Sequence, residues 1–137
     1  MNNIRLLYID LFCGAGGTST GVEKANYKGQ KCAKVIACVN HDANAIASHA
    51  ANHPEAQHYT EDMRTLDLRP LAEHTAEMRQ MYPMAKIVLW ASLECTNFSR
   101  AKGGQPRDAI TGLVFRVAQT VVNYRAKQEV EAKKVTV

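Results

Sequence analysis

The sequence predicts an α/β domain with a doubly wound, mostly parallel sheet, and two observations support this fold class. Short apolar runs alternate with helical stretches along the chain, which is typical of parallel strands joined by covering helices. Glycine-rich or polar segments directly follow these runs, and open sheets of this class bind ligands at the carboxyl ends of their strands. We therefore expect three or four strands, four helices and a ligand site at the carboxyl end of the sheet.

The first strand and the first helix are expected on either side of a glycine cluster. Residues 4–12 are rich in β-branched and aromatic side chains, as buried strands are, and the glycines end this run. Thr18 and Ser19 are both good N-caps, so the helix is expected to start at one of them. It should continue toward Lys28, and Gly29 should end it.

The second strand and helix have clearer boundaries. Residues 34–39 form an apolar run, and Asp42 can cap the alanine-rich helix 43–52 that follows. Pro54 cannot continue that helix, so we expect it to end before this position. A weak third strand is expected at 57–60.

The second half of the sequence predicts two more helices, one before and one after the most apolar strand. We expect a helix at 69–81, a buried strand at 86–92 with Trp90 in the core, and a loop at 93–108. From residue 109 a helix is expected with one apolar face, made of Ile110, Leu113, Val114, Val117, Val121 and Tyr124.

Composition excludes several classes of protein. Hydrophobic residues make up 46% and charged residues 22% of the 137, which fits one globular domain and neither a disordered chain nor a membrane protein. A net charge of +4 permits an anionic partner. The four cysteines form no CxxC pair and no secretory signal precedes them, so we expect reduced thiols in a cytoplasmic protein.

The glycine-rich segment DLFCGAGG, residues 10–17, is the first candidate site. Its glycines let a ligand approach the backbone, and the helix after it offers free N–H groups. It lacks the third glycine of a dinucleotide fingerprint and the lysine of a phosphate-binding loop. Asp10 supplies a carboxylate, which favours an uncharged or cationic ligand. The alternative is a tight turn whose glycines serve packing alone.

Four segments in order resemble the motifs of the cytosine-C5 DNA methyltransferases, which bind S-adenosylmethionine. DLFCGAGG resembles the first motif, VIACVNHDANAIASHAANHP the second and its helix, TEDM at 60–63 the third, and LECTNFS at 93–99 the catalytic loop. The resemblance covers residues 4–108 and implies a Rossmann-like fold of the methyltransferase type, truncated after the fourth motif. We therefore divide the chain into a cofactor-binding and catalytic-loop region, 1–108, and a C-terminal helix, 109–137, which does not match the family continuation.

The resemblance implies a set of cofactor-binding residues. Phe12, Gly14, Ala15 and Gly17 would line the methionine and ribose, Asn40 would hold the ribose hydroxyls, and His41 would stack on the adenine. Asp62 would accept a hydrogen bond from the adenine amino group, and Met63 would donate one from its backbone. The full set is Asp10, Phe12, Gly14, Ala15, Gly17, Asn40, His41, Asp62 and Met63.

The resemblance also implies that Cys95 is the catalytic nucleophile. Its thiolate would attack C6 of a cytosine flipped out of double-stranded DNA, so that C5 can accept the methyl group. Nearby cations favour a thiolate and also suit DNA phosphates. The DNA-binding candidates are Ser99, Arg100, Lys102 and Arg107. Glu94 departs from the family, which has proline before the cysteine, and a carboxylate there opposes thiolate formation.

The later motifs of the family, including the glutamate that engages cytosine N3 and the target-recognition region, have no counterpart in the sequence. The apolar strand 86–92 would then lie at an open edge of the sheet, which proteins usually cover. We expect a homo-oligomer or a complementing chain that carries the missing motifs. An inactive or split cofactor-binding module is one alternative to an active enzyme, and a tRNA cytosine-C5 methyltransferase fragment is another. The family suggests bacterial or phage DNA methylation, including restriction–modification.

His49 and His53 are four residues apart on a predicted helix, a spacing that can bind zinc. They lack the glutamate of HExxH, so we interpret them as surface histidines and expect no metal site. Cys13 is interpreted as a small packed residue within the glycine-rich segment.

Overall fold

A four-stranded parallel sheet forms the centre of the molecule. The computed structural model describes residues 3–62, 64–92, 112–121 and 124. The strands β1 (Leu6–Leu11), β4 (Ala33–Asn40), β5 (Gln57–Thr60) and β6 (Lys86–Ala91) lie in the order β5-β4-β1-β6. All of the pairs are parallel, which confirms the predicted fold class and the weak third strand.

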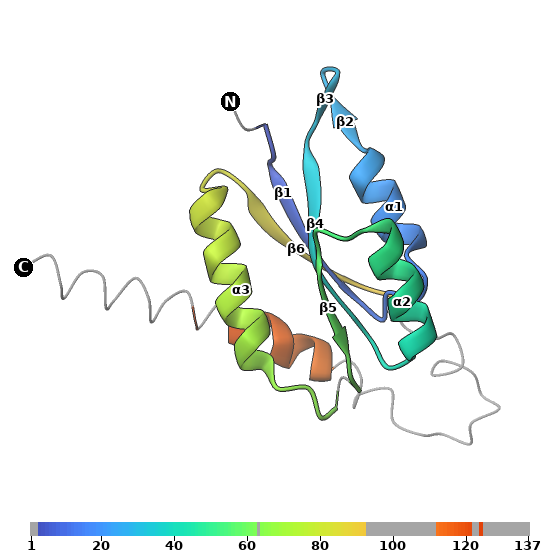
Figure 1. The fold of residues 1–137 in the computed structure, drawn as a ribbon. Coiled ribbons are helices and arrows are strands. Elements are labelled where there is room, and N and C mark those ends of the chain that lie inside the picture. The colour runs from blue at the N-terminus through green and yellow to red at the C-terminus, as the bar shows by residue number, and fades with distance from the viewer. Residues whose placement is uncertain (1–2, 63, 93–111, 122–123, 125–137) are drawn as a thin grey trace, which may run out of the picture.

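Helices cover both faces of this sheet (Figure 1). On one face, α1 (Gly17–Lys24) and α2 (Ala43–Asn52) pack on a small apolar cluster that includes Cys13 and Ile46. On the other face, α3 (Leu68–Met81) and the helix of residues 112–121 close the larger core. That core contains Leu7, Ile9, Leu11, Ile36, Val39, Leu71, Met78, Val117 and Val121. The sheet is therefore doubly wound, as predicted.

A register shift in β4 determines which side chains face which helices. Tyr8 pairs with Val35 but Ile9 pairs with Ala37, so Ile36 is one extra residue in β4. After the shift, Asp10 aligns with Cys38 on the α1/α2 face. The ring Nε2 of His74, from α3, donates to the carbonyl of Ile36 at 2.9 Å, which satisfies an acceptor at the irregularity.

The first helix differs from the prediction at both ends. Its N-cap is Gly16, and Ser19 is buried inside the protein instead of capping the helix. It ends at Lys24, and a short hairpin follows, formed by β2 (Asn26–Tyr27) and β3 (Gln30–Lys31). Lys28 and Gly29 both have positive φ, 52° and 77°, as a two-residue hairpin turn requires.

The other two predicted helices, and the predicted Asp42 cap, agree closely with the structure. Asp42 accepts from the backbone N–H of Asn44 at the start of α2, as expected. Asp67 caps α3 in the same way, although the sequence analysis did not predict this cap. None of the helices in the described part of the chain is both long and apolar enough to span a membrane.

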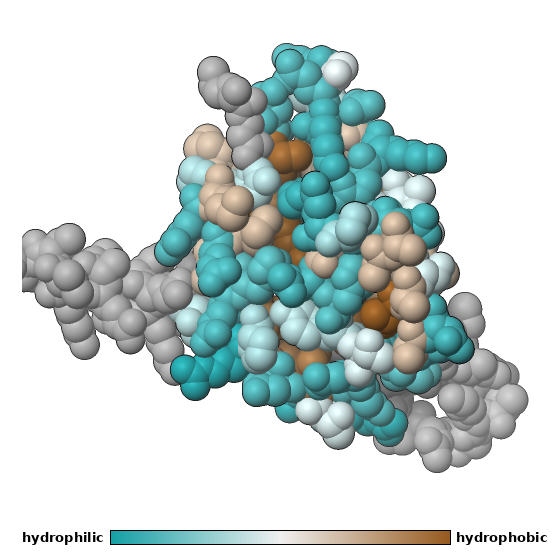
Figure 2. All heavy atoms as spheres, viewed as in Figure 1, coloured by the Kyte–Doolittle hydropathy of each residue, from teal (hydrophilic) through white to brown (hydrophobic). Residues whose placement is uncertain are grey.

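Strand β6 is an edge strand in the described sheet, as predicted, but the placement of Trp90 in the core is wrong. The Trp90 side chain is 45% exposed, and its indole N–H donates to the hydroxyl of Ser92. The strand is only half-buried because β1 pairs with it on one side. The face that Figure 2 shows is mainly hydrophilic, with apolar atoms visible in narrow strips between elements.

Candidate functional site

The candidate site lies at the carboxyl end of the sheet, where three backbone hydrogen bonds bring the strand ends together. The N–H of Cys13, just after β1, donates to the carbonyl of Val39 in β4. The N–H of Glu61, after β5, donates to the carbonyl of Asn40. The N–H of Ser92, after β6, donates to the carbonyl of Leu11. The segments that follow all four strands therefore start next to one another.

The glycine-rich loop between β1 and α1 has an unusual backbone. Phe12 has a φ of 58° although it is not glycine, and Gly14 and Gly16 have φ values of 54° and 107°. A positive φ is costly for a bulky residue and persists only where the surroundings enforce it, often at functional sites. The Phe12 side chain is half-buried against the larger core, which holds this conformation.

The outer side of the loop has space for a ligand. A Cβ atom added at Gly14 or Gly17 would meet no described atom within 4 Å. Ala15, between them, is exposed. No described side chain caps the start of α1, so its first N–H groups are not used by a cap. These amides and the open space suit an oxygen-bearing ligand group at the helix N-terminus.

Asp10 lies beneath the loop and faces the protein interior. It is only 1% exposed, and its Oδ2 accepts from the Ser19 hydroxyl at 2.8 Å. Its Oδ1 has no hydrogen-bond partner among the described residues. Burial raises the pKa of this carboxyl, and the Ser19 hydrogen bond and His53 partly oppose that effect. Direct contact between Asp10 and a cofactor stays a prediction.

Asn40, His41 and Asp62 lie beside the loop at the ends of β4 and β5. Asn40 pairs with Thr60 across the two strands, and its Oδ1 accepts from the N–H of Asp42 at 2.8 Å. Its Nδ2 group has no partner among the described residues and can donate to a ligand hydroxyl. His41 is exposed, so its ring is accessible for stacking.

The carboxylate of Asp62 is held by Arg64, a residue that the sequence analysis missed. The Arg64 side chain donates to both oxygens, with distances of 2.8 Å to Oδ2 and 3.1 Å to Oδ1. The backbone N–H of Arg64 donates to Oδ1 at 2.8 Å. These hydrogen bonds lower the pKa of Asp62 to about 2. The only sequence signal was a cation two residues after an acid, which is too common to be informative.

Several predicted site residues lie outside the described part of the chain. They are Met63, Cys95, Ser99, Arg100, Lys102 and Arg107, and their roles stay predictions.

Behind the loop lies a buried polar network, and here the interpretation of His49 and His53 as surface residues is wrong. His49 is fully buried and His53 is 9% exposed. Ring atom Nε2 of His49 lies 2.8 Å from the Ser19 hydroxyl, and Nδ1 lies 2.9 Å from Nε2 of His58. Burial, aided by the two neighbouring histidines, lowers the pKa of His49 to about 4.

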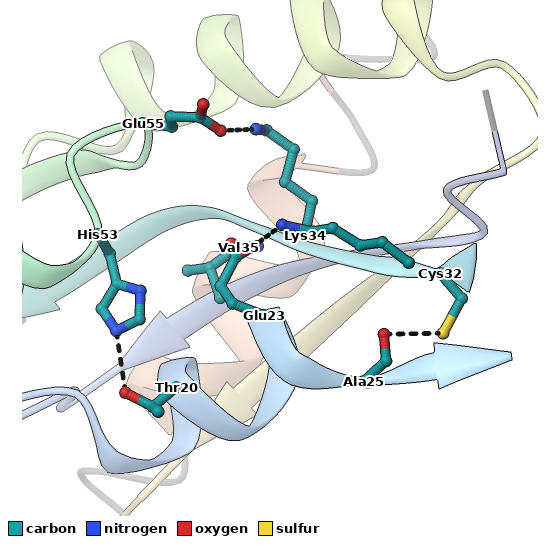
Figure 3. A network of polar contacts seen from close by, with 9 residues as sticks. Thr20, Glu23, Ala25, Cys32, Lys34, Val35, His53 and Glu55 are labelled. Carbon is teal, nitrogen blue, oxygen red and sulfur yellow. Dashed lines mark hydrogen bonds and ion pairs between the residues drawn. The ribbon is translucent and has the colours of Figure 1, made fainter. Parts of the chain in front are cut away.

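His53 lines a separate hollow of about 560 Å³ between α1, β3 and the turn after α2. Its Nε2 lies 3.2 Å from the Thr20 hydroxyl. The contact is drawn as a dashed line in Figure 3. Lys34 pairs with Glu55 at 2.6 Å in the same region. None of the predicted site residues lines this hollow, so it is distinct from the candidate site.

Comparisons with known proteins show the family and two similar proteins. The family model of C-5 cytosine-specific DNA methylases matches residues 6–128. A curated relative, the type II methyltransferase M.AgeI of Thalassovita gelatinovora, is 31% identical over 100 residues, which are 73% of this chain and 20% of the relative. A solved structure described as a DNA modification methyltransferase encoded within a prophage of E. coli is 29% identical, with a TM-score of 0.47. That match covers 69% of this chain and 24% of the other. The chain thus spans about a fifth of the length of the curated relative.

Proposed function

Because the chain belongs to the C-5 cytosine-specific DNA methylase family, we propose that it forms the cofactor-binding and catalytic-loop part of a DNA (cytosine-5-)-methyltransferase. The methyl donor would be S-adenosylmethionine, which supplies an electrophilic methyl group when bound. The observation that carries this proposal is the meeting of the glycine-rich loop, Asn40 and Asp62 at the carboxyl end of one parallel sheet.

The described residues fit this cofactor. The open side of the loop at Gly14 and Gly17 can receive its methionine part, whose carboxylate suits the uncapped N-terminus of α1. The Asn40 amide can donate to ribose hydroxyls, and the Asp62 carboxylate keeps acceptor capacity beyond its hydrogen bonds with Arg64.

The catalytic step is assigned to Cys95. Its thiolate would add to C6 of the flipped cytosine, which makes C5 nucleophilic enough to take the methyl group. Strand β6 ends at Ala91, which pairs with Leu11 at the start of the glycine-rich loop. Three peptide units link Ser92 to Cys95, a span of at most about 11 Å, so covalent geometry permits the thiol to act beside the bound cofactor. Ser99, Arg100, Lys102 and Arg107 would hold the DNA backbone.

Cofactor binding can be tested by calorimetric titration with S-adenosylhomocysteine. We expect Asp62→Ala to weaken binding by about 1–3 kcal/mol, the usual cost of leaving a polar partner unpaired. Glu61→Ala is the matched control, because it removes an exposed carboxylate one residue away. Equal affinity of the two variants would contradict the role of Asp62, and no binding by the unmodified chain would contradict a self-sufficient cofactor site.

Catalysis can be tested separately with S-adenosylmethionine and oligonucleotides that contain 5-fluorocytosine. After methyl transfer, the fluorine at C5 cannot leave as a proton would, so the covalent adduct is trapped. We expect an adduct with double-stranded DNA that Cys95→Ala abolishes and Cys32→Ala retains. An adduct with RNA alone would indicate a tRNA methyltransferase. Binding of S-adenosylhomocysteine without any adduct would indicate a module that needs a second polypeptide.

A complementing polypeptide is favoured by the exposed edge of β6. Trp90 is 45% exposed on this strand, which lies at the edge of the sheet formed by the described residues, and an edge strand can accept another strand. The relative M.AgeI is about five times longer than the segment it shares with this chain. This supports the expectation that the remaining catalytic motifs lie outside the shared segment. We expect either self-association or complementation, and a monomer in sedimentation that no complementing fragment binds would contradict this.

A further inference from the structure

A row of polar side chains crosses the sheet beneath α1 and α2. Asp10, Cys38 and His58 occupy paired positions of β1, β4 and β5, so their side chains point to the same face. The two helices lie over this face in Figure 1 and contribute Ser19 and His49. Such a row is unexpected in a core, because each buried polar group needs a compensating partner.

Three metal-binding atoms converge in this row. The Sγ atoms of Cys13 and Cys38 and a ring nitrogen of His49 lie within 4.8 Å of one another, and all three residues are buried. The distance from Cys38 Sγ to His49 Nδ1 is 3.4 Å. His58 is not one of these three residues, but its Nε2 lies 2.9 Å from the same Nδ1 atom, next to the group.

The hydrogen-bond network orients His49 for coordination. The Ser19 hydroxyl has one hydrogen, and it donates this hydrogen to the Asp10 carboxylate. Ser19 must therefore accept from His49, so Nε2 of His49 carries the ring hydrogen. The lone pair of the neutral ring is then on Nδ1, the atom that faces Cys38 and His58.

We propose that Cys13, Cys38, His49 and His58 bind one Zn²⁺ ion in tetrahedral geometry. Zinc–sulfur bonds near 2.3 Å and zinc–nitrogen bonds near 2.0 Å place a ligand sulfur and nitrogen about 3.5 Å apart, close to the value found for Cys38 and His49. Two thiolates and two imidazoles are the ligand set that selects zinc. A pair at the 4.8 Å limit would close by about 1 Å on binding.

One further observation points to a metal ion. The link from His49 through Ser19 to Asp10 is a relay from a ligand histidine to a carboxylate, the arrangement that fixes histidine ligands in zinc sites. Oδ1 of Asp10 is buried without a partner among the described residues. Two thiol protons would be released as the ion binds, so the net charge of the cluster would not change.

Cobalt titration of the full chain, treated with chelator and kept reduced, tests the proposal. We expect one equivalent of Co²⁺ to give tetrahedral d–d bands and a thiolate-to-cobalt charge-transfer band, both removed by one equivalent of Zn²⁺. Cys13→Ser and Cys38→Ser should each weaken the charge-transfer band and lose stoichiometric binding. Ser19→Ala should reduce zinc affinity about 10- to 100-fold, as loss of an outer-shell partner does.

Two matched controls locate the site. Cys32 lies outside the cluster, where its Sγ contacts the carbonyl of Ala25 (Figure 3), so Cys32→Ser should bind cobalt as the unmodified chain does. Cys95→Ser should also bind cobalt as the unmodified chain does, which would show that the proposed catalytic thiol is not a ligand of the ion. Because the first readout uses the unmodified chain, it does not depend on a variant folding. Absence of the charge-transfer band there, or its loss in either control, would overturn the proposal. In that case His58 donates to His49 and the cluster is an ordinary hydrogen-bond network.

Discussion

The substitution Gly16→Ala tests how the glycine-rich loop packs against the buried histidines His49 and His53. Gly16 has a φ of 107°, and an added Cβ would lie 2.9 Å from Cδ2 of His49 and 3.3 Å from the ring of His53. His49 is fully buried and bonded to Ser19, so its ring cannot move aside without breaking that contact. The loop therefore requires glycine here for packing against the protein interior.

The expected cost has two parts. A positive φ at this position costs an alanine roughly 1–2 kcal/mol. Forcing a methyl group into a packed site adds roughly 1–3 kcal/mol. We expect Gly16→Ala to lower the free energy of unfolding by about 3 kcal/mol, a large share of the roughly 5–15 kcal/mol typical of a domain.

Urea denaturation of three alanine variants separates the two parts. Gly14→Ala has a φ of 54° and no described atom near its Cβ, so it should lose only about 1 kcal/mol. Gly17→Ala lies in α1 with open space around it, and it should be neutral or stabilising by up to about 1 kcal/mol. The reasoning is refuted if Gly16→Ala is as stable as the unmodified chain, or if Gly14→Ala loses more.

Two further predictions concern single hydrogen-bonding groups. His74→Leu leaves the Ile36 carbonyl without its donor, so we expect a loss of about 1–3 kcal/mol in urea denaturation, whereas His74→Gln keeps a donor and should lose less. A leucine variant with unchanged stability would show that this carbonyl finds another partner. In NMR titration, Asp62 should titrate near pH 2, and Arg64→Gln should raise its pKa toward the ordinary 3.8. Because folding depresses this pKa, the small stabilisation from Asp62 is present at neutral pH and lost as the pH falls through about 2. A pKa that is unchanged in Arg64→Gln would assign the shift to the backbone N–H alone.

The sequence predicted most elements because their signals are local. The helix at 43–52 has its cap, its alanine-rich body and its terminating proline within a dozen residues, and the structure has the same bounds. The failures occur where a residue has two physically reasonable environments. Ser19 can cap a helix or be buried beside Asp10, and the choice depends on a strand nine residues earlier. The hairpin after α1 was missed because Lys28 and Gly29 are a weak form of the usual Asn-Gly turn signal.

The site was predicted in outline and not in its supporting contacts. The rings of His49 and His53 lie 4.8 Å apart, although His53 is the residue after α2 and not part of the helix. No local signal shows that both side chains turn inward. The alignment of Asp10 with Cys38 depends on the extra residue in β4, which periodicity cannot locate. Trp90 was assigned to the core because its strand is apolar, although an edge strand leaves such a side chain half exposed.

The sequence allows two interpretations of the loop glycines, ligand binding and packing, and the structure supports a different one for different glycines. Gly16 faces the buried histidines and serves packing, whereas Gly14 and Gly17 face open space where the cofactor is proposed to bind. Gly17→Ala therefore separates stability from cofactor binding. The new methyl group should cost no stability, but it would extend into the space where the cofactor is proposed to bind. We expect this variant to fold normally and to bind S-adenosylhomocysteine at least tenfold more weakly, about 1.4 kcal/mol. Unchanged affinity in a normally folded Gly17→Ala would mean that the cofactor does not approach this side of the loop, and the glycines would then serve the turn alone.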